Sequence, residues 1–160
     1  MKIVKNYFNY GFKKSLKMIP VIINTVIFSL LSILHFYWSF GGKLWYDKVL
    51  PTSSNGLNTL NPSSAARFAV AVGLLFFALI TAGTKGLFDP YINRTYFRYG
   101  ALVIALIFFL RAMGDFKFVG FSKRVKETKF AIADTQIFSP LCLFIAVLSV
   151  LIFIGTSKPI

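Results

Sequence analysis

"PVIINTVIFSLLSILHFYWSF", residues 20–40, contains no Asp, Glu, Lys or Arg. An apolar run of this length can cross the hydrocarbon core of a bilayer as an α-helix, which needs about 20 residues. Residues 65–83, 99–118 and 139–155 form three further, mostly apolar runs. Transmembrane β-strands would be about ten residues long and alternate apolar with polar positions. The sequence therefore predicts an all-α, integral membrane, antiparallel four-helix bundle in a single domain over residues 1–160.

Two of the predicted spans carry signals for where their helices begin. Pro20 suits the first turn of a helix, where its missing N–H is no loss. Ser139 and Pro140 are typical of an N-cap followed by the first helical residue. We therefore expect the first and fourth helices to begin at these positions.

The composition supports a membrane protein. Hydrophobic residues make up 56% of the chain and charged residues 14%, whereas a soluble domain is about a quarter charged. The net charge is +13, but the basic residues lie mainly beside the apolar runs, where they can meet anionic headgroups. We expect membrane lipids and a small amphiphilic ligand as partners, and no nucleic acid; the oligomeric state stays open.

The sequence offers little to a metal or a cofactor. Its single cysteine, Cys142, cannot form a disulfide within the chain, and no His and Cys residues have zinc-ligand spacing. A haem held between His35 and Met113 lacks an attachment motif. We therefore expect no cofactor and no metal.

The basic residues also bear on topology. Four spans place both termini on one side, which carries nine Lys and Arg against seven on the other. Across the first span the contrast is five Lys in residues 1–17 against two in the following loop. By the positive-inside rule we expect a cell-membrane protein with both termini in the cytoplasm. The third loop, with five basic residues, breaks that rule, so something besides topology must account for its charges.

The segment before the first span is basic and contains aromatic residues. Residues 1–17 either lie on anionic lipid as an interfacial segment or form a solvated tail. No small-residue cleavage site follows the first apolar run, so we expect that span to stay in the membrane.

One membrane face gathers the unusual residues. In an antiparallel bundle, the end of span one, the start of span two, the end of span three and the start of span four meet at one surface. The candidate binding residues there are His35, Trp38, Arg111, Asp115, Asp134 and Ser139. Four of them also have a structural explanation: an aromatic belt for Trp38, a hydrogen-bonded structural role for His35, and an ion pair between Arg111 and Asp115, four residues apart.

Small and polar residues form stripes on the first two spans. Asn24, Ser32, His35, Ser39 and Gly42 share one face of the first helix, so we expect this stripe to face the bundle interior. On the second span, Ala65, Ala69 and Gly73 recur at four-residue steps. Close helix packing would explain this second stripe.

Two stretches, "LHFYWSFGGKLWYDKVLP" (34–51) and "LRAMGDFKFVGFSKRVKETKFAIADTQIFSPLCL" (110–143), resemble a family of small bacterial membrane proteins of unknown function with four predicted spans. The pattern is HxYW–GG followed by RAxGDF–GF–F–D–SPLC, and the resemblance covers nearly the whole chain. Met113 departs from it, standing where Ile or Val is expected. The matching positions are His35, Tyr37, Trp38, Gly41, Gly42, Arg111, Gly114, Asp115, Phe116, Gly120, Phe121, Asp134, Ser139 and Pro140.

The resemblance implies the four-span architecture and favours the grouping at one face, but it carries no activity. Three classes of function stay open. The first is binding or transport of a lipid or small amphiphile at that face. The second is an accessory or structural membrane protein without a ligand. The third is a membrane enzyme with His35 and Asp115 as acid–base groups, which would both have to reach one bound group.

Overall fold

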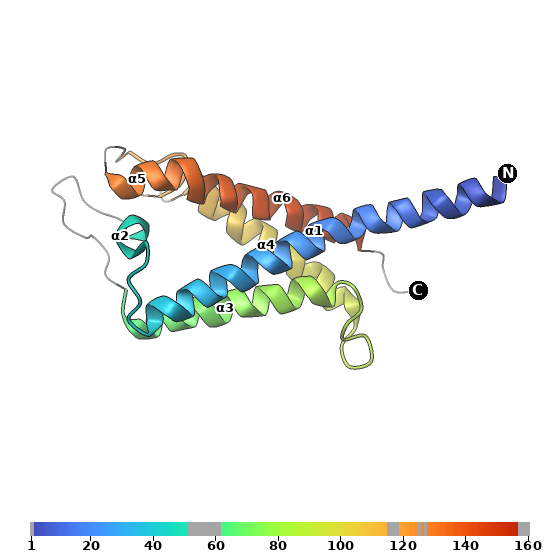
Figure 1. The fold of residues 1–160 in the computed structure, drawn as a ribbon, viewed down its shortest axis with the longest axis horizontal. Coiled ribbons are helices and arrows are strands. Elements are labelled where there is room, and N and C mark those ends of the chain that lie inside the picture. Colours follow the sequence, from blue (N-terminus) through green and yellow to red (C-terminus); the bar gives the residue numbers. More distant parts are fainter. Residues whose placement is uncertain (1, 51–61, 115–118, 125, 127, 157–160) are drawn as a thin grey trace.

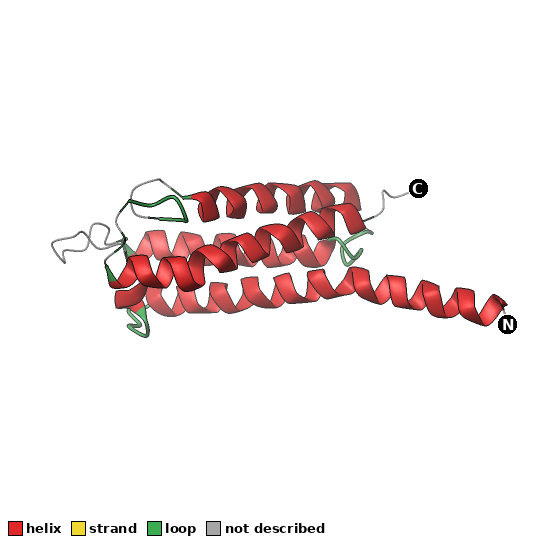
Figure 2. Cartoon of the chain, turned by 90° about the horizontal axis from the view of Figure 1, so that it is seen from above, coloured by secondary structure: helices red, strands yellow, loops and turns green. Residues whose placement is uncertain are grey.

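The computed structural model describes residues 2–50, 62–114, 119–124, 126 and 128–156, without the side chains of residues 2–16, 47 and 48. Among these residues every regular element is a helix, and loops or turns connect the helices, as Figure 2 shows. The elements are α1 (Lys2–Ser39), α2 (Tyr46–Val49), α3 (Ser64–Gly83), α4 (Arg94–Met113), α5 (Lys129–Ala133), the π-helical segment η1 (Asp134–Phe138) and α6 (Ser139–Gly155).

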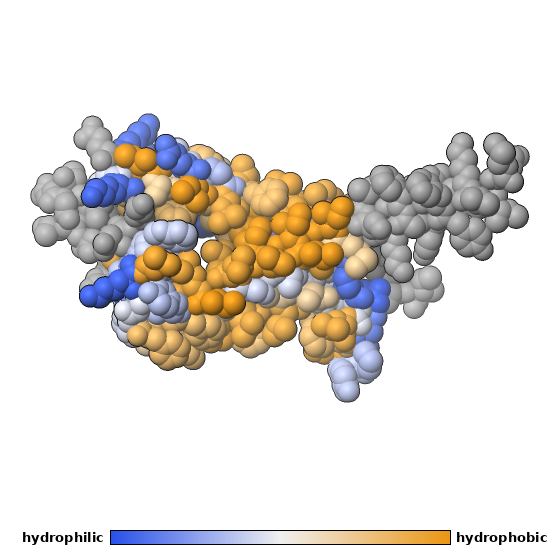
Figure 3. Space-filling view, viewed as in Figure 1, coloured by the Kyte–Doolittle hydropathy of each residue, from blue (hydrophilic) through white to orange (hydrophobic). Residues whose placement is uncertain are grey.

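Four helical stretches are long and apolar enough to cross a membrane: Lys17–Ser39, Ser64–Gly83, Arg94–Met113 and Lys129–Gly155. Many of their large apolar side chains point outward, where a soluble protein would carry polar groups. Figure 3 shows, on the face in view, apolar residues across the middle of the molecule and hydrophilic residues toward its two ends. The chain is a multi-pass membrane protein, and the predicted all-α four-helix architecture is confirmed.

The bundle consists of two helical hairpins. α1 packs along α3 and α4 packs along α6, and the two pairs meet through smaller α1–α6 and α3–α4 contacts. Phe28, Leu74, Ala78, Ile104 and Ile145 bring all four helices into one buried cluster. Figure 1 shows the hairpins spreading apart toward the end that carries α2 and α5, which touch each other there. This open end is the membrane face where the candidate residues were expected.

Two residues of the polar stripe on the first span, Asn24 and Ser32, are buried and face the bundle interior, as expected. Asn24 Nδ2 donates to Ser149 Oγ of α6 at 2.9 Å, and Ser32 Oγ donates to the Ala71 carbonyl of α3 at 2.8 Å. The hydroxyl of Ser32 thus ties α1 to the backbone of its hairpin partner. The bond from Asn24 ties α1 to the other hairpin.

The predicted start of the first helix at Pro20 is wrong, because α1 begins at Lys2 and Pro20 lies inside it. Proline removes one backbone hydrogen bond from a helix interior. That loss is tolerable near the edge of the membrane, where water can reach the freed carbonyl. Residues 2–16 continue the helix beyond the bundle (Figure 1).

α1 ends in a glycine pair. Gly42 N donates to the Tyr37 carbonyl at 2.9 Å and Gly41 N to the Trp38 carbonyl at 3.2 Å. These two bonds are those of a Schellman motif, with Gly41 at the position that needs a positive φ, here 91°. The chain therefore turns sharply toward α2.

The predicted N-cap at Ser139 is also wrong. The cap of this helical run is Thr128, whose Oγ1 accepts from Ala131 N at 3.1 Å. α5, η1 and α6 follow one another without a break from Lys129 to Gly155, and Ser139 N donates to the Asp134 carbonyl in the π-helical turn. Because that turn holds five residues, Asp134 and Ser139 come to lie on the same side of the helix.

The opposite end of the bundle holds the α3–α4 connection and both termini of the described chain (Figure 1). Lys85 Nζ donates to the Lys17 carbonyl at 2.7 Å. Burial, together with the charges of Lys17 and Arg94, lowers the pKa of Lys85. Asp89 and Arg94 form an ion pair at this end, with about a third of each side chain exposed.

Candidate functional site

A cavity of about 170 Å³ lies at the open end, between α1, α2 and α3. Its wall is mostly apolar and aromatic, and Arg67 is its cation. The lining residues are His35, Trp38, Tyr46, Val49, Leu50, Pro62, Ala66, Arg67 and Val70. No carboxylate is among these lining side chains, within the part of the chain that the structure describes.

Arg67 is held by neutral groups. One guanidinium nitrogen donates to the Tyr46 hydroxyl, the other donates to Ser64 Oγ at 2.8 Å, and Nε is buried without an acceptor. The guanidinium carbon also lies 5.2 Å from the centre of the Tyr46 ring, a cation–π contact. Among the described residues, the charge of Arg67 has no anionic partner.

His35 and Trp38 form the α1 side of the cavity, with ring centres 4.9 Å apart in an edge-on arrangement. His35 Nδ1 lies 2.9 Å from the Leu31 carbonyl of its own helix. Trp38 Nε1 donates to the Leu44 carbonyl at 2.8 Å, and Trp38 is nearly fully buried. These two bonds fix both rings against the turn that leads into α2.

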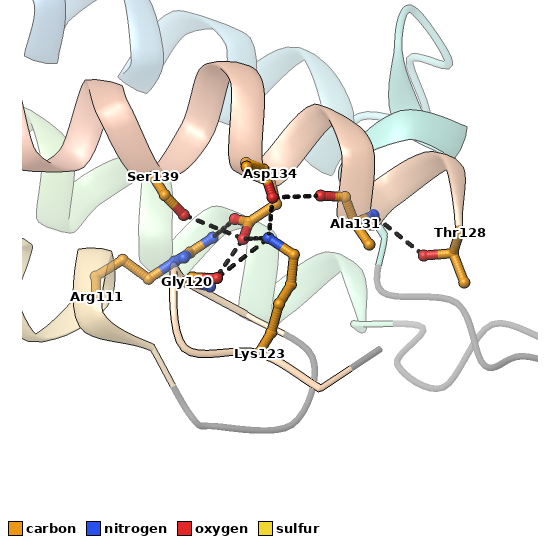
Figure 4. A network of polar contacts seen from close by, with 8 residues as sticks. Arg111, Gly120, Lys123, Thr128, Ala131, Asp134 and Ser139 are labelled. Atoms are coloured by element: carbon orange, nitrogen blue, oxygen red, sulfur yellow. Dashed lines mark hydrogen bonds and ion pairs between the residues drawn. The ribbon is translucent and has the colours of Figure 1, made fainter. Parts of the chain in front are cut away.

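A second set of polar residues surrounds the carboxylate of Asp134 (Figure 4). The Asp134 side chain is fully buried. Arg111 Nη2 donates to its Oδ1 at 3.0 Å. Its Oδ2 accepts from Gly120 N at 2.8 Å, Lys123 Nζ at 2.9 Å and Ser139 Oγ at 3.1 Å. We refer to Arg111, Gly120, Lys123, Asp134 and Ser139 as the Asp134 cluster.

Lys123 has its hydrogen bonding satisfied inside this cluster. Besides Asp134, its ammonium donates to the Gly120 carbonyl at 3.1 Å and to Thr135 Oγ1 at 2.6 Å. The side chain is only 2% exposed. Burial of a lysine at this depth requires such a set of acceptors and a counter-charge.

The cluster depends on how the chain leaves α4. Phe121 N donates to the Ala112 carbonyl at 2.9 Å, so residues 119–122 fold back over the last turn of the helix. Gly114 and Gly120 lie backbone to backbone at that crossing, with φ of 91° and 85°. A Cβ on Gly120 would lie 2.4 Å from Gly114 Cα. Only a glycine pair allows this approach, which places Gly120 N and Lys123 on the Asp134 carboxylate.

The structure divides the candidate residues between the two groups. His35 and Trp38 line the cavity, whereas Arg111, Asp134 and Ser139 meet in the Asp134 cluster. Asp115 lies outside the described residues, so its expected pairing with Arg111 stays a prediction. Arg111 has Asp134 as its carboxylate partner in the described part of the chain.

Three contributing residues were not singled out as site residues by sequence: Arg67 and Tyr46 in the cavity, and Lys123 in the cluster. For Lys123 a signal was present, because the third loop carries more basic residues than the positive-inside rule allows. Its burial on Asp134 accounts for one of those charges. Nothing local in the sequence indicates that Tyr46 would meet Arg67, since that contact joins two helices.

Comparison with protein families gives one match. The family described as "Protein of unknown function (DUF3995)" matches residues 28–149, more than half of the chain. The chain belongs to the DUF3995 family. The comparisons with curated proteins and with solved structures gave no match.

The DUF3995 match includes both the cavity and the Asp134 cluster, since all of their residues fall between 28 and 149. It does not extend over residues 1–27. In the described residues of the match and of its flanks, no three His, Cys, Asp or Glu side chains gather as metal ligands would.

The two groups differ in what they offer a ligand. In the Asp134 cluster the carboxylate already accepts four hydrogen bonds and lies between two cations, so it is saturated. The cavity instead combines an apolar wall, a partly buried imidazole and a cation that has no anionic partner among the described side chains. Pockets that bind small molecules commonly have this composition, an apolar lining with a few convergent polar groups.

Proposed function

We propose that this membrane protein binds a small amphiphile with an anionic group in the cavity between α1, α2 and α3. The observation that carries the proposal is that Arg67, in an otherwise apolar and aromatic wall, has no anionic partner among the side chains that the structure describes. A cation in a poorly solvated place gains most from an anion, and a planar guanidinium suits a carboxylate or phosphate.

The position of Arg67 strengthens this electrostatic argument. Arg67 lies in the first turn of α3, whose first turn contains no acidic residue. The N-terminal end of a helix carries a partial positive charge, so it opposes a cation there and favours an anion. An anion in the cavity would be attracted both by the guanidinium and by the end of α3.

The cavity also suits an amphiphile by its place and size. It is lined by the last turns of α1 and the first turns of α3, and at the end of a membrane-spanning helix headgroups and apolar chains adjoin. Its volume of about 170 Å³ is close to that of an engineered cavity of about 150 Å³ that accepts benzene. A benzene-sized apolar body with one anionic group therefore fits the space, and benzoate is a suitable probe.

Binding of benzoate to the detergent-solubilised full-length protein tests the proposal. We expect Arg67→Gln to weaken benzoate binding about 10- to 100-fold, as for loss of a charged hydrogen-bonded partner. Arg124→Gln is the matched control, because it removes the same charge from an exposed loop position at the same end. Isothermal titration of the three proteins gives the affinities. Equal affinities in wild type and Arg67→Gln would rule out the proposal.

We also propose that the protein resides in the cytoplasmic membrane with both termini in the cytoplasm. The support is the bias of basic residues across the first span, five before it against two after it. The excess of basic residues in the third loop opposes this orientation. Lys123 accounts for one of these charges, because it is buried in an ion pair with Asp134.

A further inference from the structure

His35 presents a defined hydrogen-bonding edge to the cavity. Its Nδ1 lies 2.9 Å from the Leu31 carbonyl. A carbonyl oxygen can only accept, so Nδ1 must carry the proton. In the neutral imidazole the lone pair is then on Nε2, at the far edge of the ring from that bond. The Nδ1 edge is turned back to α1, so Nε2 is the ring nitrogen that His35 can offer as an acceptor to a ligand in the cavity it lines.

The other polar groups of the cavity offer donors. Tyr46 Oη accepts from Arg67, so its own proton remains available to an acceptor on a ligand. The indole N–H of Trp38 is already used by the Leu44 carbonyl. Arg67 and Tyr46 therefore suit an oxyanion, and His35 is the one lining side chain, among those described, whose free ring nitrogen accepts.

An acceptor that a ligand covers must receive a hydrogen bond from that ligand. A ligand that fills the cavity displaces water from His35 Nε2, and a desolvated acceptor without a donor opposes binding. A ligand with a donor directed at this nitrogen avoids the penalty. The polar side chains of the cavity therefore suit a ligand with two features: an oxyanion that binds Arg67 and Tyr46, and a hydrogen-bond donor that binds His35.

We propose that the natural ligand is a hydroxylated acid, with a benzene-sized apolar body that carries both an anionic group and a hydroxyl. The anionic group binds at Arg67 and Tyr46, and the hydroxyl donates to His35 Nε2. This assignment rests on the proposed function and specifies the ligand class for the same cavity.

The probes are benzoate and the three isomeric monohydroxybenzoates, titrated into the detergent-solubilised full-length protein. These probes share their anionic group and ring, so they differ in the hydroxyl alone. We expect at least one isomer to bind about 3- to 10-fold more tightly than benzoate, the effect of one added hydrogen bond. His35→Phe should abolish this preference, so that this isomer and benzoate then bind with equal affinity. His35→Gln, whose amide oxygen can accept in a similar place, should restore part of the preference.

The possible outcomes separate the two proposals. If benzoate binds with dependence on Arg67 but no hydroxylated isomer binds more tightly, the ligand class is wrong and the proposed function stands. If none of the four probes binds, both proposals fail. If the preference for a hydroxylated isomer survives in His35→Phe, the hydroxyl is recognised elsewhere and the role of His35 is wrong. The comparison of isomers in wild type needs no variant, so the test does not depend on how a variant folds.

Discussion

At the scale of single residues, Asp134 has the most demanding environment in the described chain. Its carboxylate is fully buried and accepts four hydrogen bonds, two of them from cations. A buried charge is stable only when it is paired and its hydrogen-bonding capacity is used. Removal of the carboxylate would leave Lys123 almost fully buried without its counter-charge.

We therefore expect Asp134→Ala to lower the free energy of unfolding by about 3–5 kcal/mol, the usual cost of breaking a buried ion pair from one side. Asp89→Ala is the matched control, because Asp89 and Arg94 pair at the surface with about a third of each side chain exposed. Such a pair contributes at most about 1 kcal/mol. Denaturant unfolding in detergent measures both. Similar losses in the two variants would mean that burial of the Asp134 cluster adds nothing to stability.

At this scale, the sequence indicates which residue types gather at one membrane face more readily than which residues bond to one another. Arg111, Asp134 and Ser139 were expected at one membrane face and they meet in one cluster. The bond from Lys123 could not be anticipated, because it depends on how residues 119–124 cross the end of α4. A side chain's chemistry is local, whereas its partner is set by the path of the chain.

At the scale of elements, two glycine environments contrast. Gly120 has a φ of 85° and lies against the backbone of Gly114 at the end of α4. Gly73, within α3, has open space where a Cβ would lie. The predicted close packing of the Ala65, Ala69 and Gly73 stripe within the chain is wrong, since Ala65 and Ala69 are exposed as well. The bundle buries a different face of α3, which includes Ala71, Leu74 and Ala78.

We expect Gly120→Ala to destabilise the protein by about 2 kcal/mol or more, from a strained φ and a clash with backbone. Gly73→Ala should stabilise it by about 0.5–1 kcal/mol, because alanine is the better helix former and meets no obstacle. Thermal unfolding of both variants against wild type gives the two signs. A harmless Gly120→Ala would show that the loop does not need its close approach to α4.

The start of the fourth span shows a limit of cap signals. Serine followed by proline is typical of a helix start, but here Ser139 lies inside a helical run that begins at Lys129. The π-helical turn from Asp134 lets Ser139 Oγ donate to that carboxylate, which a regular cap would not. Single π-turns are frequent at functional sites. The local pattern predicts an N-cap at Ser139, whereas the structure places this residue at the end of a π-helical turn.

At the scale of the whole molecule, the two hairpins separate the cavity from the Asp134 cluster. They share a packed core around Phe28 and Ile145 and separate toward α2 and α5. The cavity lies within the α1–α3 hairpin and the Asp134 cluster within the α4–α6 hairpin. One end of the bundle therefore holds the cavity and the buried Asp134 cluster on different hairpins.

The proposed orientation predicts a labelling pattern in a Cys142→Ala background. Tyr91 is an exposed residue between α3 and α4, and Lys126 is exposed at the opposite end. With both termini in the cytoplasm, a membrane-impermeant maleimide should label Lys126→Cys in intact cells and should label Tyr91→Cys only after permeabilisation. The reverse pattern would place the termini outside the cytoplasm.

Four membrane-spanning helices and their approximate positions follow from the amino-acid sequence alone. An apolar run in a bilayer must satisfy its backbone hydrogen bonds within itself, so its length and composition are enough. The three-dimensional arrangement was needed to show that His35 and Trp38 share a cavity with Arg67, and that Arg111 and Lys123 share Asp134. These contacts join different helices and depend on the turns at Gly41, Gly114 and Gly120, whose directions no apolar pattern specifies.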